Sequence, residues 1–180
     1  MSDNKTSGWI HYRWPRPGAE EESWKTAYVK LVTAASGTEY VVGSGLYDMK
    51  VEKVFLVETV DEAAELIEQK GREAFPALRD KAGPFRYRDV YVFVHDKSGT
   101  ELVNPGFPDM EGQNHIDLED ADGKLIVRET ISLLEDKETG WIDYMWPKPG
   151  ETEPSAKTAY IRKVTVGPEV LYVGAGLYPD

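Results

Sequence analysis

The C-terminal part of the chain reads GWIDYMWPKPGETEPSAKTAYIRKVTVGPEVLYVGAGLY, from Gly140 to Tyr178. An earlier stretch, from Gly8 to Tyr47, reads GWIHYRWPRPGAEEESWKTAYVKLVTAASGTEYVVGSGLY. Over residues 8–33 and 140–165 the two copies align without a gap, and 16 of 26 positions are identical. About one or two identities would arise by chance at ordinary residue usage. The chain therefore contains an internal repeat, and the rest of the sequence is interpreted around it.

Each copy of the repeat predicts three consecutive antiparallel strands. In the second copy, residues 141–146 alternate large apolar and polar side chains, which is typical of a half-buried strand. The following PKPG ends this strand, because proline has no amide donor and glycine suits a turn. Residues 157–164 and 171–178 predict the other two strands, and the glycines of the last one indicate a close backbone approach or a bend. Such a meander needs a partner layer to be stable.

A helix is predicted between the two copies. Apolar residues recur there at three- and four-residue steps, namely Val60, Ala63, Ala64, Ile67, Ala74, Phe75 and Leu78. Thr59 with Glu62 would form a capping box that starts the helix at that point. Asp48 would instead cap a longer helix, which we favour because the charged residues 50, 52, 53 and 58 then fall mostly on a solvated face. Gly71 and Pro76 predict a break or kink before a short continuation to Arg79.

The remaining segments predict two strands and a second helix. Residues 89–96 form a strong strand pattern, residues 97–99 a tight turn, and residues 100–103 the returning strand. A loop follows, and a second helix is expected from Asp122 to about Leu134. Hairpin connections exclude a wholly parallel sheet, so the fold class is α+β, an antiparallel sheet with helices packed on it.

Composition limits the classes of function. A net charge of −11 and a pI near 4.8 argue against binding to nucleic acid or to an anionic membrane surface. The chain has no cysteine, which excludes disulfides, thiolate metal sites and a cysteine nucleophile. No apolar run approaches the roughly 20 residues that span a bilayer, and the polar residues 1–7 do not form a secretory signal. The chain is therefore expected to be either cytoplasmic or an excised piece of a longer protein.

Residues 49–180 resemble a single Cache domain, the PAS-like ligand-sensing module of bacterial and archaeal receptors. The resemblance is carried by EAAELIEQKGREAFPALRDKAGPFRYRDVYVFVHDKSGTELVNP at residues 62–105, MEGQN at 110–114, DADGKLIVRE at 120–129, and the second copy of the repeat. Residues 1–48 are expected to hold a partial Cache repeat, because the meander at 8–48 resembles the last three strands of a preceding unit. The resemblance thus implies a tandem array.

The resemblance also implies a fold and a function. It predicts an antiparallel sheet of five or six strands with a long N-terminal helix packed behind it, plus the extra three-stranded meander. It implies non-covalent binding of a small molecule, often a short-chain carboxylate, in an extracytoplasmic sensor region. The partner would be an output domain, linked through the membrane and missing from this chain, of a chemotaxis receptor, histidine kinase or cyclase.

In domains that this chain resembles, the ligand lies between the sheet and the loop–helix segment that joins the second and third strands. The loop 104–118 and the strands 89–95 and 141–146 would line that pocket here. A carboxylate needs a cation or several donors inside an apolar cup. The candidate cations are Lys157, which matches Lys25 of the first copy, then Arg128 and Arg86. The candidate hydroxyl donors are Tyr144, Tyr160 and Tyr91, the candidate walls are Trp141, Trp146 and Phe93, and Asn104 stands where many relatives carry histidine.

Structural roles compete with each of these assignments. Lys157 is alternatively a strand lysine paired with Asp143 or Glu153. Trp141 and Trp146 are five positions apart and point to opposite faces of a regular strand, so at least one of them packs rather than binds. The pair of Tyr144 and Trp146 shares a face and is the better candidate. For Tyr91 and Phe93 we weigh core packing above ligand contact, and Arg128 is more often solvated.

Catalysis and metal binding are not predicted. The spacing offers no nucleophile with a base and an orienting group, and no close pair of carboxylates, so we expect neither an enzyme nor a cofactor. His11, His95 and His115 are scattered, which disfavours a histidine metal site. The acidic residues at 117–123 form an incomplete calcium loop, for which helix capping is the simpler explanation.

Three functions remain open from the sequence. The first is a ligand-binding sensor module. The second is a structural module, in which the exposed edge of the first meander packs within the chain or is exchanged between two chains to form a homodimer. The third is a soluble carrier of a small metabolite.

Overall fold

A computed structural model of the protein describes residues 6–179, and the chain forms two compact units, one ending at Lys50 and the other beginning at Val51. The N-terminal unit is an antiparallel sheet of three strands, β1 (Ser7–Pro15), β2 (Glu22–Thr33) and β3 (Glu39–Tyr47), in the order β1-β2-β3. The meander predicted from the first copy of the repeat is therefore confirmed.

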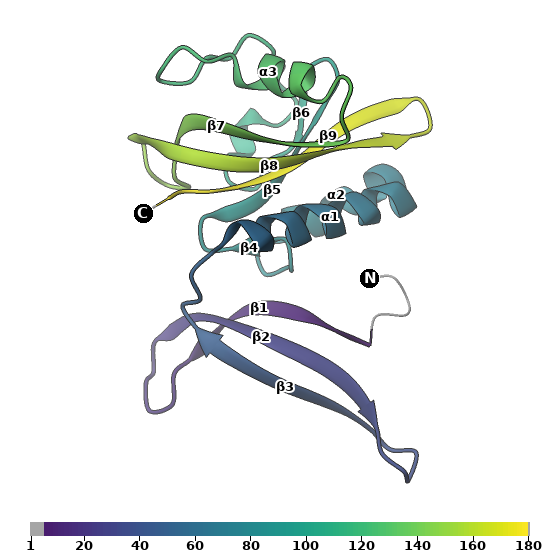
Figure 1. Ribbon diagram of the computed structural model, residues 1–180. Coiled ribbons are helices and arrows are strands. Elements are labelled where there is room, and N and C mark those ends of the chain that lie inside the picture. The colour runs from purple at the N-terminus through teal and green to yellow at the C-terminus, as the bar shows by residue number, and fades with distance from the viewer. Residues whose placement is uncertain (1–5, 180) are drawn as a thin grey trace. The chain divides into compact units, whose positions relative to one another are not determined.

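The C-terminal unit is built around a six-stranded antiparallel sheet (Figure 1). Its strands are β4 (Arg86–Tyr87), β5 (Val90–Asp96), β6 (Glu101–Val103), β7 (Thr139–Pro147), β8 (Pro154–Val166) and β9 (Glu169–Leu177). They follow the order β4-β5-β9-β8-β7, and β6 also pairs with β5. The last strand of the chain thus lies in the middle of the sheet, which explains why its residues 171–176 are buried on both faces. The short β4 has no counterpart in the sequence prediction.

One face of this sheet is covered by helices. α1 (Lys53–Lys70) packs against β8 and β9 and continues through the 3₁₀ turn η1 (Gly71–Ala74) into α2 (Phe75–Arg79). The break occurs at Gly71, whose φ of 58° favours glycine. The apolar positions that predicted the helix form its buried side.

The predicted start of the helix at Asp48 is wrong. α1 begins at Lys53 with Glu52 at the N-cap position, and the carboxylate of Asp48 instead accepts a 2.5 Å hydrogen bond from Arg16. Asp48 has a φ of 51°, which is not the extended backbone of an N-cap residue. The capping box at Thr59 does not form either, because the Thr59 hydroxyl donates to the Phe55 carbonyl one turn earlier inside the helix.

The opposite face of the sheet carries the long loop after β6, with the 3₁₀ turn η2 (Pro108–Met110), and α3 (Ile126–Leu133), which lies against β7. α3 begins four residues after the predicted start at Asp122. The Asp120 carboxylate holds the preceding turn, because it accepts hydrogen bonds from the backbone N–H groups of Asp122 and Lys124. Its other oxygen accepts the N–H of Met145 on β7, so the turn is also tied to the sheet. The sheet therefore separates α1 from the layer formed by the loop and α3.

The internal repeat is reproduced in structural detail. Trp9 pairs with Tyr28 as Trp141 pairs with Tyr160, and the ring centroids are 5.3 and 5.1 Å apart. Each copy also has the same hydrogen bond: the hydroxyl of Tyr47 donates to the Pro15 carbonyl, and the hydroxyl of Tyr178 donates to the Pro147 carbonyl. The two meanders thus share their strand register and the contact that ties the end of the third strand to the end of the first.

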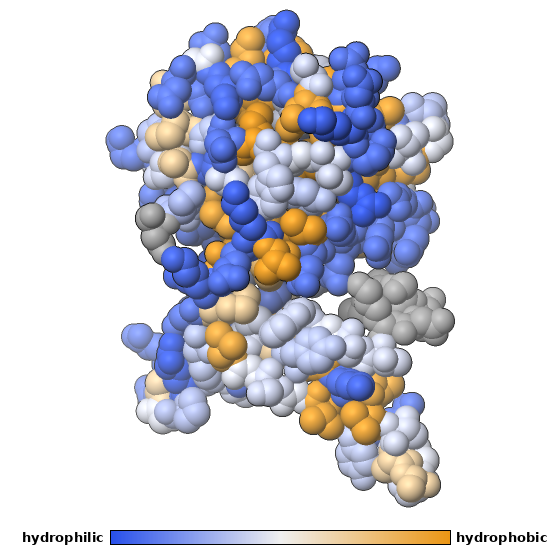
Figure 2. Space-filling model, viewed as in Figure 1, coloured by the Kyte–Doolittle hydropathy of each residue, from blue (hydrophilic) through white to orange (hydrophobic). Residues whose placement is uncertain are grey.

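The two copies differ in how their third strands are covered. Val173 of β9 is 0% exposed, whereas its counterpart Val42 of β3 is 57% exposed. Figure 2 shows hydrophobic side chains reaching the surface of the three-stranded sheet. The first meander therefore has the strands of the second without its covering layers.

Candidate functional site

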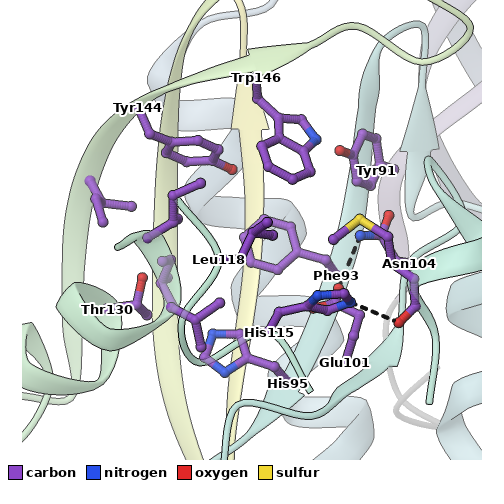
Figure 3. A pocket seen from close by; sticks show the side chains of 15 residues that line it. Tyr91, Phe93, His95, Glu101, Asn104, His115, Leu118, Thr130, Tyr144 and Trp146 are labelled. Carbon is purple, nitrogen blue, oxygen red and sulfur yellow. Dashed lines mark hydrogen bonds between the residues drawn. The ribbon is translucent and has the colours of Figure 1, made fainter. Parts of the chain in front are cut away.

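A cavity of about 50 Å³ lies on the face of the sheet opposite α1, beneath the loop after β6 and beside α3 (Figure 3). Its walls come from β5, β6, β7, β8, the loop and α3, namely Tyr91, Phe93, His95, Glu101, Asn104, Met110, His115, Leu118, Ile126, Val127, Thr130, Ile142, Tyr144, Trp146 and Ile161. Roughly 10–15 Å³ of such space holds one water molecule, so this cavity accommodates a guest of only a few non-hydrogen atoms. It occupies the place predicted from the loop 104–118 and the strands 89–95 and 141–146.

Strand alternation decides which candidates reach the cavity. Tyr91 and Phe93 on β5, and Tyr144 and Trp146 on β7, are spaced by two and share the face with the cavity. The tryptophan pair divides as its spacing predicts, with Trp146 at the cavity and Trp141 on the other face.

Trp141 and Tyr160 are directly paired across β7 and β8, on the face that carries α1. The Lys53 ammonium at the start of α1 lies 4.9 Å from the centroid of the Trp141 ring. Because a sheet separates them from the cavity, Trp141 and Tyr160 are packing residues beneath the helix, and we leave both out of the site.

Lys157 is buried behind the cavity wall, with 2% of its side chain surface exposed. Its Nζ donates a 2.9 Å hydrogen bond to the hydroxyl of Tyr91. Four aromatic rings surround the ammonium, with centroids 4.3 to 5.9 Å from Nζ, namely Tyr91, Tyr178, Tyr144 and Phe93. Removal from water lowers the pKa of Lys157 to about 7.

Glycine at position 176 makes room for this lysine. A Cβ at Gly176 would lie 2.5 Å from the Cε of Lys157. Likewise, a Cβ at Gly174 would lie 2.5 Å from the ring of Phe93. The glycines of β9 therefore allow neighbouring side chains to lie flat on the strand, which is the close backbone approach that the sequence indicated.

The ammonium of Lys157 forms no ion pair within residues 6–179. The predicted alternative pairing with Asp143 does not form, because the Asp143 carboxylate accepts the Thr158 hydroxyl at 2.6 Å. No ion pair joins Lys157 to Glu153 either. A lysine carries three N–H donors, and among the described residues only one of them meets an acceptor. A buried charge normally requires a partner, and within residues 6–179 the contacts of this ammonium are one hydroxyl and the faces of four aromatic rings.

Tyr144 offers a second free donor. Its ring packs 6.2 Å from that of Trp146, and its hydroxyl has no partner in the part of the chain that the structure describes. Burial raises the pKa of Tyr144 well above its usual range, so the hydroxyl keeps its proton at any physiological pH. Tyr144 is thus a neutral donor on the same wall as Lys157, with which it is directly paired across β7 and β8.

Asn104 lines the cavity but is occupied by the loop. Its side-chain oxygen accepts the N–H of Phe107 at 3.0 Å, and its side-chain nitrogen donates to the carboxyl of Glu101 at 3.0 Å. Its own backbone N–H donates to Glu111 at 2.7 Å. The role of Asn104 supported by these contacts is to fold the loop and orient Glu101.

Glu101 is a cavity residue that the sequence analysis missed. It is 5% exposed, and burial raises the pKa of its carboxyl to about 8 while the hydrogen bond from Asn104 acts in the opposite direction. The alternation of side chains along β6 could have identified Glu101, because Glu101 and Val103 lie on the same, buried face of this strand. A glutamate in phase with a buried valine is unusual enough to mark a site.

Two histidines, His95 and His115, also line the cavity. The histidines are scattered in the sequence, and no role in the site was predicted for them. The Nδ1–H of His95 donates to the Asp96 carbonyl at 3.2 Å, and its ring stacks on Tyr172 at 5.1 Å. The Nε2–H of His115 donates to the Met110 carbonyl at 3.1 Å. Within residues 6–179, no three histidine, aspartate or glutamate side chains are grouped as metal ligands.

The two candidate arginines do not reach the cavity. Arg128 is exposed on α3 and forms an ion pair with Asp117. The Arg86 guanidinium donates to the Pro105 carbonyl at 3.0 Å and so supports the start of the loop. Of the three predicted cations, the structure places only Lys157 against the cavity wall, behind the rings of Tyr91, Phe93 and Tyr144.

Comparisons with known proteins agree with this architecture. A family model described as Single Cache domain 2 matches residues 54–180. The chain is 32% identical over 146 residues to the methyl-accepting chemotaxis protein McpP of Pseudomonas putida, an alignment that covers 75% of this chain and 26% of that protein. It is 31% identical over 93 residues to the sensor histidine kinase MctS of Rhizobium johnstonii, covering 52% of this chain and 20% of the kinase. The chain thus spans about a quarter and a fifth of these two relatives.

Solved structures give the same picture. A periplasmic sensor domain of a chemotaxis protein superposes with a TM-score of 0.61 at 30% identity, over 69% of this chain and 92% of that one. A structure that describes carboxylic acid recognition by a Cache chemosensory domain gives a TM-score of 0.60 at 26% identity, over 69% and 91%. The extracytoplasmic location expected from the resemblance agrees with these relatives, and no helix within residues 6–179 is long and apolar enough to cross a bilayer. The chain belongs to the single Cache domain 2 family of sensor domains.

Proposed function

We propose that residues 51–180 bind a short-chain monocarboxylate non-covalently and without transforming it, as the input of a chemotaxis receptor or sensor kinase. The observation that carries this proposal is the buried ammonium of Lys157, which has one hydrogen bond and forms no ion pair within residues 6–179. Burial of a charge without a partner is costly, and a carboxylate guest would supply the partner together with acceptors for the unused N–H groups.

The rest of the cavity fits the same kind of guest. Tyr144 offers a neutral hydroxyl beside Lys157, while Phe93, Trp146 and Ile142 supply an apolar wall for an alkyl group. This combination of a few polar groups in a mostly apolar cup is typical of small-molecule sites. The volume of about 50 Å³ favours chains of two to four carbons over larger metabolites.

Calorimetric titration with straight-chain monocarboxylates of two to six carbons tests the proposal. The corresponding primary amides serve as matched controls, because they keep the shape of each acid and lack its charge. We expect saturable binding for the short acids, no binding for the amides, and a sharp loss of affinity once the chain exceeds the cavity. Equal binding of acids and amides, or no binding of any acid, would contradict a site built around Lys157.

The first meander suggests how the chain is organised. Its register and its tyrosine–proline hydrogen bond are those of β7–β9, which supports the interpretation that residues 1–48 contain the last three strands of a second Cache unit, while residues 49–180 form a complete one. Its strands expose Tyr40, Val41 and Val42, whose counterparts in β9 are buried. In a tandem protein those side chains would be covered by the other parts of that unit.

The same exposed side chains support a second candidate function, an assembly module whose meander is exchanged between two chains. Exchange buries the bare faces of β3 without any further segment. Light scattering on residues 1–180 distinguishes the two: a concentration-independent dimer that Val41→Asp converts to monomer supports exchange, and a monomer at all concentrations rules it out.

A further inference from the structure

We propose that Glu101 is a second ligand-contacting residue and that it shares a proton with the carboxylate of the guest, so that in alkaline solution the domain takes up a proton from solvent when it binds its ligand. This inference rests on the proposed function and adds a residue, a protonation state and a pH dependence to it.

The first support is the position of Glu101. Its carboxyl belongs to the cavity wall, is 5% exposed, and is fixed by the hydrogen bond from Asn104 to Oε1. Among the residues that the structure describes, no other group hydrogen bonds to this carboxyl. Figure 3 shows Asn104 beside Glu101 at the edge of the cavity. The second oxygen of Glu101 is therefore available to a guest.

The second support is the balance of charge around the cavity. The groups that face Glu101 from other elements are the ammonium of Lys157 on β8, the hydroxyls of Tyr91 and Tyr144, the rings of His95 and His115, and the carboxylate of Glu111 in the loop. Glu111 is compensated outside the cavity by Arg79, at 2.8 Å. Lys157, which lies behind the cavity wall, is then the cation whose charge acts on Glu101.

A carboxylate guest changes this balance. With Glu101 ionised, the guest would place a second negative charge beside a single ammonium in a site that excludes most water. Two carboxyl groups that share such a site do not both ionise, and one of them keeps a proton. Glu101 already has its pKa raised to about 8 by burial, so it is the group prepared to hold that proton. The O–H of Glu101 then donates to an oxygen of the guest, and where Glu101 is ionised before binding the proton comes from the buffer.

This arrangement predicts how affinity depends on pH. At pH 6 Glu101 is already protonated in the free domain, and binding at this residue needs no further proton. At pH 9 the free domain has lost that proton and must take it up again on binding. The protonation of Glu101 therefore makes the affinity of the domain for the acid fall about tenfold for each pH unit above the pKa of Glu101. The reason is that one more proton is bound in the complex than in the free domain.

Above its own pKa of about 7, Lys157 also takes up a proton when the acid binds. The experiment must therefore distinguish proton uptake by Glu101 from proton uptake by Lys157. The Glu101→Gln variant keeps the shape and a hydrogen-bond donor but cannot be ionised. Titration of wild type and E101Q with a short monocarboxylate at pH 9, in two buffers of different ionisation enthalpy, counts the protons taken up. Glu119→Gln, which changes an exposed carboxylate beside the same loop, is the matched control.

We expect wild type and E119Q to take up about one proton more than E101Q at pH 9. We also expect E101Q to bind about tenfold more tightly than wild type at that pH and equally well at pH 6. Equal proton uptake in wild type and E101Q would overturn this inference while leaving the proposed function intact. A failure of wild type to bind any short acid at either pH would overturn both.

Discussion

The Nζ of Lys157 lies 4.3 Å from the centroid of the Tyr91 ring and donates a 2.9 Å hydrogen bond to the hydroxyl of the same residue. One tyrosine thus supplies both a π face and an oxygen to a buried ammonium. The ring of Tyr178 lies 5.1 Å from the same Nζ, and the hydroxyl of Tyr178 donates to the Pro147 carbonyl. The lysine is held in place by a chain of contacts that ends on the backbone, although no carboxylate neutralises it.

Replacement of Lys157 by methionine should abolish carboxylate binding and leave the fold intact. Methionine matches the length and volume of the lysine stem, and exchange of an unpaired buried charge for an apolar group is often neutral or stabilising. We expect affinity to fall by at least about 100-fold, as for loss of a charge-assisted hydrogen bond worth about 3 kcal/mol. Calorimetry measures the affinity, and thermal unfolding checks the fold.

The repeat supplies the control for this experiment. Lys25 occupies the same position in the first meander, with its Nζ 5.0 Å from the centroid of the Tyr47 ring. The change Lys25→Met should leave carboxylate affinity unaltered. Similar losses in both variants would show that the effect is not specific to the cavity.

Replacement of Gly176 by alanine should displace Lys157. The new Cβ would lie 2.5 Å from Lys157 Cε and 3.2 Å from the Thr158 carbonyl oxygen. The Lys157 side chain must therefore move, because the backbone of the neighbouring strand has little freedom to shift. Overpacking of this kind costs about 1–3 kcal/mol, and we expect both a lower melting temperature and weaker ligand binding. Gly8→Ala is the control, because its Cβ meets nothing within 4 Å. A G176A variant with unchanged affinity would argue that the position of Lys157 does not matter to the guest.

The two tryptophans of β7 should separate binding from packing. Trp146→Ala enlarges the cavity, and we expect the preferred acid to become longer by at least one or two carbons. Trp141→Ala removes a ring from the opposite face and should lower the melting temperature without altering the preferred chain length. Titration with the series of acids gives the comparison. The site would be misplaced if Trp141→Ala changed the length preference and Trp146→Ala did not.

His95 should make the domain less stable in mild acid. Burial lowers its pKa to about 4 from an ordinary 6.5, so the unfolded chain takes up a proton at pH 6.5 while the folded domain resists until about pH 4. Between these values the unfolded state binds more protons, and stability therefore falls as the pH is lowered from 6.5 to 4. His95→Phe keeps a ring to stack on Tyr172 and should show a smaller fall than wild type when melting temperatures are measured across this range. Parallel curves for the two proteins would contradict a buried neutral histidine.

Local patterns were sufficient to predict much of this structure. The period of two in residues 141–146 fixed the faces of Trp141 and Trp146, and the step of three and four residues in α1 identified its buried side. The start of α1 could not be predicted, because Asp48 forms an ion pair with Arg16, a residue that is distant in sequence. β4 has only two residues and therefore no period to detect.

The site was less accessible to sequence reasoning. Lys157 could be chosen because it repeats Lys25, but its burial depends on the glycine that faces it across a neighbouring strand. Tyr160 was predicted as a donor because its residue type fits, whereas strand pairing with Trp141 places it under the helix. Glu101 was overlooked because its environment is created by a loop whose fold depends on Asn104.

Tyr144 and Trp141 lie on one strand and point in opposite directions, the former toward the cavity and the latter toward the first turn of α1. A molecule in the cavity consequently has no direct access to the helix that follows the first repeat. Under the proposed function, an effect of such a molecule on α1 would have to pass through the thickness of the sheet, and β7 has one aromatic side chain at the cavity and another beneath the helix.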